Sequence, residues 1–246
     1  MVDVFGEVDE QLRSDRIAGL ARKYLPWAVG VAVILLVAAF GAWGFVSYRD
    51  HVAAEASTAY SQGLDSLSKG DKAGAAAKFA IVAKSGSAVY RCLGLMQEAG
   101  LHLDAGDQAG AVALFDQAAQ AAPNQDLGDA ARLKSALALL DTASLTDLET
   151  RLQPLTDVKR PLRTLAREAL AMAKLRAGRI AEARADFNLL KIDPDASQGL
   201  AERAGAAVTL IDEGSASAIA PTVKAAVALP PAAAQPAAPV ASGAAQ

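Results

Sequence analysis

A glycine, an alanine and a phenylalanine recur at fixed spacing in three stretches of this chain. In each stretch Ala follows Gly by five residues and Phe follows it by nine. The copies are Gly70, Ala75 and Phe79, then Gly106, Ala111 and Phe115, then Gly178, Ala183 and Phe187. The glycines lie 36 and 72 residues apart, and a fixed period of this length is typical of stacked helix pairs. The Gly closes each turn and the Ala lets two helices approach closely. The spacing therefore predicts an α-solenoid.

Composition agrees with an all-α fold. The 246 residues are 52% hydrophobic but only 5% aromatic, with an apolar content dominated by the helix formers Ala and Leu. A formal net charge of −3 at pH 7 gives no basic footprint for nucleic acid, so we expect no nucleic-acid partner. The single cysteine, Cys92, excludes a disulfide-stapled fold; we interpret it as a packed core residue, with an intermolecular disulfide as the alternative.

Residues 24–48 form an uncharged run between Lys23 and Arg49. As a helix these residues would extend roughly 37 Å, enough to cross a hydrocarbon core of roughly 30 Å. Aromatic residues typical of a bilayer interface lie near its two ends: Tyr24, Trp27, Trp43 and Tyr48. The run predicts a single transmembrane helix.

A buried core helix and a cleavable signal peptide are the alternatives for this run. A core helix seldom extends this far without a polar residue, and the small-x-small tripeptide at residues 39–41 lies inside the run rather than after it. Four basic residues precede the run, whereas Arg49 is the basic residue that follows it closely. This asymmetry places the N-terminus in the cytoplasm. In a Gram-negative bacterium the protein would then be a single-pass inner-membrane protein with a periplasmic C-terminal domain.

We therefore expect four segments. Residues 1–23 form a cytoplasmic amphipathic segment, either simply solvated or a docking element, and residues 24–48 form the transmembrane helix. Residues 49–214 form the tetratricopeptide-like domain. Residues 215–246 are rich in Ala and Pro and are predicted to be mostly disordered, with a peptide ligand for an aromatic groove as the alternative.

Helix start and stop signals divide residues 49–214 into about four pairs and a capping helix. The expected pairs are 48–69 with 72–84, 89–105 with 108–121, 127–140 with a shorter helix near 145–155, and 162–177 with 180–191; 198–213 is the cap, and 216–229 is a weak candidate for its partner. The third pair is degenerate, because Thr142 occupies the expected Gly position and Asp147 the expected Ala position.

The sequence holds little that points to catalysis. The Ser-x-x-Lys match at residues 66–69 lacks the elements that accompany it in enzymes. His51 and His102 have no second His within a helical turn to share a metal ion. We predict no catalytic, cofactor or metal site, no small-molecule substrate and no enzymatic activity.

Protein binding is instead expected on the concave face, which the first helix of each pair lines in solenoids of this type. The predicted binding residues are Tyr60, Leu64, Met96, Arg132, Glu168, Met172 and Arg176. Leu64, like Leu67 and Leu103 nearby, has a helical spacing that also suits the core. Two adaptable Met side chains with scattered charges suit varied polypeptide surfaces.

Residues 1–16 (MVDVFGEVDEQLRSDR), the run that follows, and residues 166–178 (AREALAMAKLRAG) resemble the YfgM-type ancillary subunits of the SecYEG translocon. The resemblance covers residues 1–214. It implies an inner-membrane anchor, a periplasmic tetratricopeptide-like domain, and an association with SecYEG and the periplasmic chaperone PpiD. It implies a role in handling newly exported polypeptides and carries no catalytic residue with it.

The expected function is therefore a membrane-anchored periplasmic scaffold that binds proteins beside the translocon. Two other classes stay open. One is a scaffold for cell-envelope or cell-division assembly that uses the same surface. The other is a membrane-bound signalling adaptor that acts through residues 1–23.

Overall fold

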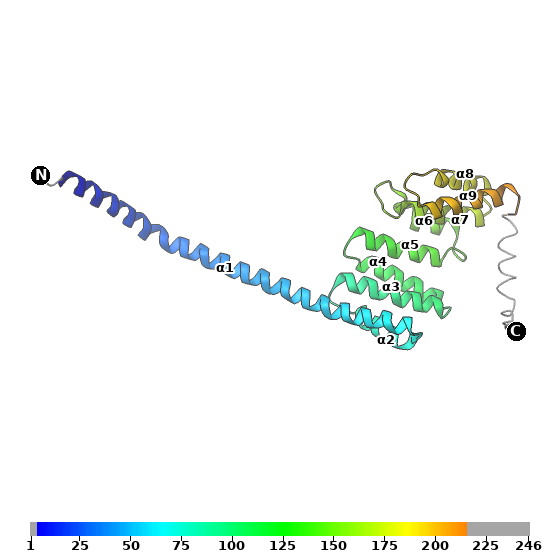
Figure 1. Cartoon of the computed structure of the whole chain (residues 1–246), viewed down its shortest axis with the longest axis horizontal. Helices are drawn as coiled ribbons and strands as arrows, with labels where there is room; N and C mark the ends of the chain where they lie inside the picture. The colour runs from blue at the N-terminus through cyan, green and yellow to red at the C-terminus, as the bar shows by residue number, and fades with distance from the viewer. Residues whose placement is uncertain (1–3, 216–246) are drawn as a thin grey trace, which may run out of the picture. The chain divides into compact units, whose positions relative to one another are not determined.

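The computed structural model describes the backbone of residues 4–215 and the side chains of residues 27, 29–31 and 33–215 (Figure 1). The chain divides into two compact units, residues 1–94 and 95–246. The described backbone is helical with connecting turns and contains no strand, which confirms the all-α class. The side chains of the predicted cytoplasmic segment, and the predicted tail from residue 216 onward, lie outside the described residues.

The first unit is dominated by one long helix. Helix α1 (Val4–Ser68) continues without a break into the first repeat, as predicted, and packs against α2 (Lys72–Val82) (Figure 1). Gly70 adopts a φ of 78°, so the turn between the two helices uses a conformation that other residues rarely adopt. The Asp71 side chain then caps α2 by accepting a hydrogen bond from the Gly74 N–H at 2.8 Å.

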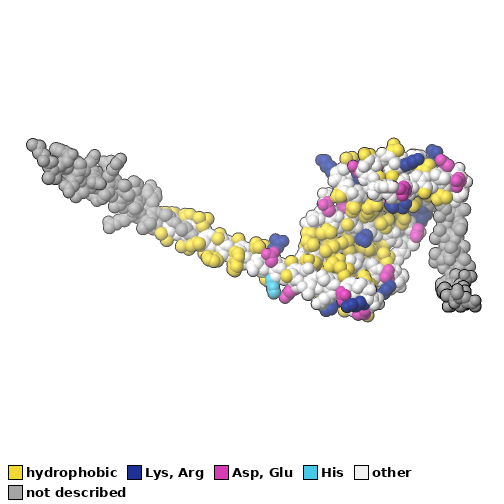
Figure 2. Space-filling view, in the orientation of Figure 1, with side chains coloured by type: hydrophobic (Ala, Val, Ile, Leu, Met, Phe, Trp, Pro, Cys, Tyr) yellow, Lys and Arg dark blue, Asp and Glu magenta, His cyan; other side chains and the backbone are white. Residues whose placement is uncertain are grey.

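The apolar part of α1 is uncovered. Every described side chain from residue 27 to residue 51 is exposed, including Trp27 at 77% and Phe40 at 69%. Figure 2 shows hydrophobic side chains along this stretch of the helix. Within the described residues, one helical stretch, Val29–Ser68, is long and apolar enough to cross a membrane; its best window has a mean hydropathy of 2.4 and is 0% buried. A helix that is apolar all round needs an apolar environment, and the described residues do not cover this stretch.

Where α1 meets α2, small residues allow the two helices to lie close together. A Cβ on Gly63 would lie 2.6 Å from Phe79 Cε1, so a larger residue would clash with the Phe79 ring. Phe79, Ala75 and Cys92 are completely buried, which confirms the core role predicted for each of them. Burial also raises the pKa of the Cys92 thiol, because a thiolate is poorly solvated among apolar groups.

The second unit is a series of helices joined by short turns. They are the C-terminal part of α3 (Ala88–Asp104), then α4 (Gln108–Ala121), α5 (Gln125–Ala138), α6 (Leu145–Leu152), a 3₁₀ helix η1 (Gln153–Thr156), α7 (Arg163–Arg176), α8 (Ile180–Lys191) and α9 (Gln198–Asp212). From α4 to α9 each α-helix packs against the next. The predicted helices 108–121 and 180–191 have the observed bounds, and other boundaries are within two or three residues.

The Gly, Ala and Phe positions act as the repeat predicts. Gly106 and Gly178 have φ values of 80° and 77° at the turns between helices. Phe115 and Phe187 are 3% and 1% exposed, and Ala111 and Ala183 are 0% exposed. Helix α9 covers the end of this core as predicted, because its residues Leu200, Ala204, Val208 and Ile211 join the cluster that contains Phe187.

The third repeat differs from its prediction by one residue. Its second helix, α6, is capped by Ser144, so Leu148 and Leu152 occupy the positions equivalent to Ala111 and Phe115. Thr142 lies in the turn between α5 and α6, as expected, but the position predicted for Asp147 was wrong by one residue. Asp147 instead belongs to the cap: its N–H donates to Ser144 Oγ at 3.2 Å, and the Ser144 hydroxyl donates to its carboxylate at 2.6 Å.

Helix α6 is also short, as predicted. It has 8 residues, whereas α4 has 14 and α8 has 12. Pro154 follows its last residue closely and has no N–H to continue the α-helical hydrogen bonds, and the chain continues as η1.

Candidate protein-binding surfaces

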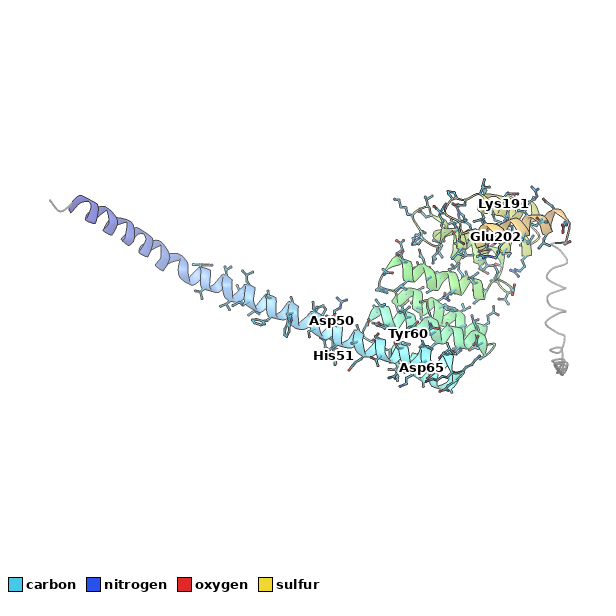
Figure 3. All side chains as sticks on the ribbon, in the orientation of Figure 1. Asp50, His51, Tyr60, Asp65, Lys191 and Glu202 are labelled. Atoms are coloured by element: carbon cyan, nitrogen blue, oxygen red, sulfur yellow. The ribbon has the colours of Figure 1, made fainter. Side chains whose placement is uncertain are left out.

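In the first unit, the predicted binding residues Tyr60 and Leu64 lie in the part of α1 beyond the apolar run, and α1 packs against α2. Figure 3 labels Tyr60 on this part of the helix. The Tyr60 ring contacts two other aromatic rings, with centroids 5.8 Å from Phe79 and 6.2 Å from Tyr90. It is partly buried and stabilises the packing of this unit. Leu64 is 40% exposed and remains available at the surface.

In the second unit, helix α7 brings three of the predicted residues onto one face. Glu168, Met172 and Arg176 follow each other at intervals of four residues, so their side chains lie in one row. Met172 is 39% exposed. Met96 on α3 is partly buried against Ala99, Ala111 and Phe115, so part of its side chain belongs to the core.

Glu168 and Arg176 both hold neighbouring segments together. The Arg203 guanidinium on α9 donates to both carboxylate oxygens of Glu168, at 2.8 and 2.9 Å, and this pairing raises the pKa of Arg203. Arg176 donates to the backbone carbonyls of Asp141 and Ala143 in the α5–α6 turn. A ligand on this face would meet these two groups already hydrogen-bonded.

Arg132, unlike the three residues on α7, lines a surface hollow. This hollow has a volume of about 540 Å³, and we name it the α4–α6 hollow; the residues that line it are Asp116, Ala119, Gln120, Arg132, Thr150, Arg151 and Pro154. The Arg132 side chain is 49% exposed and donates one N–H to Asp129 at 3.1 Å. The other walls come from α4, α6 and η1, so the second helices of two repeats contribute to this site.

A second hollow also borders η1. This η1–α8 hollow has a volume of about 340 Å³, and the residues that line it are Gln153, Thr156, Arg167, Leu170, Lys174, Asp186, Leu189 and Leu190. Leu170 and Leu190 are buried, while Leu189 is 63% exposed. Because Gln153 lines one hollow and Pro154 lines the other, η1 is their shared wall.

An ion-pair network crosses the repeats beside the first hollow. Arg151 of α6 donates to both carboxylate oxygens of Asp116 on α4, at 2.9 and 3.1 Å, and to Ser135 on α5 at 2.9 Å. The Asp116 and Arg151 positions are 35 residues apart, and Glu168 and Arg203 are also 35 apart. Oppositely charged residues about one repeat apart are the sequence signal that would have identified both pairs.

Asp129 is the one acidic residue among the described buried residues. Its side chain is 1% exposed and lies between two arginines, with Arg160 Nη1 at 2.7 Å and Arg132 Nη1 at 3.1 Å. A carboxylate removed from water needs such partners, so this cluster fixes α5 against the loop before α7.

One further acidic side chain, Asp107, has a local role at a helix end. Asp107 caps α4 by accepting the Gly110 N–H, and it contacts His102 at 2.7 Å. These two interactions, the backbone hydrogen bond first, lower the pKa of Asp107 below its ordinary value. Within the same part of the chain, no group of three or more His, Cys, Asp or Glu side chains is arranged to hold a metal ion.

Comparison with known protein families matches the Tetratricopeptide repeat-like domain over residues 22–189. The chain belongs to this family, whose domains typically bind proteins rather than catalyse reactions. Comparisons with curated proteins and with solved structures give no match.

Proposed function

We propose that this protein is an inner-membrane-anchored periplasmic scaffold, ancillary to the Sec translocon, that assists chaperone handling of newly exported proteins. The observation that carries the proposal is the uncovered apolar helix that continues directly into a tetratricopeptide-like domain. The resemblance of residues 1–16 and 166–178 to the YfgM-type subunits supports the translocon, a PpiD-like chaperone and exported polypeptides as its partners.

Tethering supplies the mechanism. A domain held at the membrane by α1 samples a small volume next to its neighbours there. Modest contacts therefore gain from a high effective concentration, and the repeat surface needs only broad, weak complementarity to many polypeptides. The exposed Leu64 and Met172 side chains suit such contacts, because apolar side chains bind varied partners without fixed hydrogen-bond geometry.

The proposed topology can be tested with introduced cysteines. The native Cys92 is buried with a raised pKa, so it should stay unlabelled in the folded protein. With a membrane-impermeant maleimide on intact spheroplasts, we expect Lys191→Cys to be labelled and Ser14→Cys to be labelled only after lysis. Lys191 is an exposed residue at the end of α8 (Figure 3). The reverse labelling pattern would refute the topology.

Photo-crosslinking in cells tests the partners. A photoreactive amino acid at Met172 should trap translocon subunits, the PpiD-like chaperone or exported polypeptides, whereas the same group at Lys191 should trap much less. Recovery of division or envelope-assembly proteins from Met172 would favour the alternative scaffold. Loss of function on deletion of residues 1–23, with crosslinking unchanged, would favour a signalling adaptor.

A further inference from the structure

The two hollows beside η1 form a surface that the repeat pattern does not explain. They are lined mainly by second helices and η1, together with side chains from α5 and α7. In the neighbouring repeats the second helices are 12 to 14 residues long, whereas α6 ends after 8 residues. We infer that the truncated helix leaves the two hollows beside η1.

The lining of the two hollows contains more basic than acidic side chains. It includes four basic side chains and two acidic ones: Arg132, Arg151, Arg167 and Lys174, and Asp116 and Asp186. Both acids are already paired, Asp116 with Arg151 and Asp186 with Lys174 at 2.5 Å. The other two basic side chains have no acidic partner within the lining, on a chain whose formal net charge is −3.

Those two side chains are Arg132 and Arg167, one in each hollow. Arg132 shares Asp129 with Arg160, which lies closer to that carboxylate. Arg167 makes only long contacts, 3.4 Å to Asp193 and 3.5 Å to the Thr156 carbonyl, and Asp193 is already bound by Arg163 at 2.7 Å. Both guanidinium groups therefore retain donors for a further acceptor.

We propose that these hollows bind an acidic polypeptide segment that crosses η1. A carboxylate side chain of the segment pairs with Arg132 in the α4–α6 hollow and another pairs with Arg167 in the η1–α8 hollow. An apolar side chain rests on Leu189 and on the edge of the buried Leu170 and Leu190. This proposal rests on the scaffold function and adds a second docking surface, separate from the row of Glu168, Met172 and Arg176.

The test uses the full chain in non-ionic detergent and two fluorescent 12-residue peptides, one with Glu-Glu-Leu repeated four times and one with Gln-Gln-Leu. Fluorescence anisotropy should show that the Glu peptide binds at least tenfold more tightly, and that added salt weakens its binding. Equal binding of both peptides would overturn the proposal. Equally tight binding of a single-stranded RNA oligonucleotide would also overturn it, because the surface would then attract any polyanion.

Matched variants locate the binding. The double variant Arg132→Gln with Arg167→Gln should weaken Glu-peptide binding at least tenfold. The double variant Lys134→Gln with Lys191→Gln removes the same charge from exposed positions outside the hollows and should change it less than twofold. Equal effects of the two double variants would refute the proposed site.

A second pair of variants tests occupancy without a change of charge. Thr150→Tyr fills the α4–α6 hollow and should reduce binding, whereas Thr146→Tyr, one turn away on α6 and outside the hollow, should not. Circular dichroism melting identifies any variant that fails to fold. The Met172 crosslinking does not depend on these residues, so the scaffold proposal and this docking surface can fail separately.

Discussion

Replacing Phe187 by alanine is expected to lower the free energy of unfolding of the second unit by about 3 to 5 kcal/mol. Phe187 is 1% exposed and lies in a cluster formed by α7, α8 and α9, with Ala171, Leu190 and Leu200 among its members. The small alanines around it cannot close the cavity that the ring would leave. Urea denaturation of the full chain in detergent, followed by circular dichroism, measures the loss.

The matched control is Leu189→Ala on the same helix. Leu189 is 63% exposed, so its removal should change stability by less than about 0.5 kcal/mol. A loss below about 1 kcal/mol for Phe187→Ala would mean that the repeat phenylalanine does not hold α7, α8 and α9 together. Such a result would contradict the physical basis of the Gly, Ala and Phe spacing.

The sequence predicted most helices closely because their signals are local. Gly70, Gly106 and Gly178 each have a positive φ at a turn, and Asp71 and Asp107 each cap the helix that follows. The inward position on α6 was predicted one residue too early because the local signals of this helix are weaker. That turn has no glycine, and Ser144 takes over the capping one residue later than the repeat predicts.

The surfaces were harder to predict than the helices. The sequence predicts Arg132 as a binding residue of a first helix, but its surroundings depend on Thr150 and Arg151 of α6 and on where α6 ends. The sequence does not predict Arg167, because the availability of its guanidinium depends on Arg163 binding Asp193 more closely. Which of two arginines binds a shared carboxylate depends on distances in three dimensions. The repeat period shows only that the partners lie about one repeat apart in the sequence.

The second large effect is expected at the buried carboxylate. Arg160→Met should lower the free energy of unfolding by about 3 kcal/mol, because the 1% exposed Asp129 side chain would lose its closer partner. Arg132 would remain, but its guanidinium is half exposed and shared with solvent. The same urea denaturation measures this loss, and Arg184→Met is the control, since Arg184 and Asp212 form an exposed pair whose loss should matter much less.

A double-mutant cycle distinguishes two causes of the lost stability, an unpaired buried charge and lost packing. If the cost of Arg160→Met comes from leaving a carboxylate without its partner, then adding Asp129→Asn should recover part of the stability, because the neutral amide is cheaper to bury. The double variant should therefore be more stable than Arg160→Met alone, with a coupling energy of about 0.5 to 3 kcal/mol. If the two losses simply add, Arg160 stabilises the loop before α7 through its aliphatic stem. The Asp129 cluster would then not be what orients Arg132 toward the α4–α6 hollow.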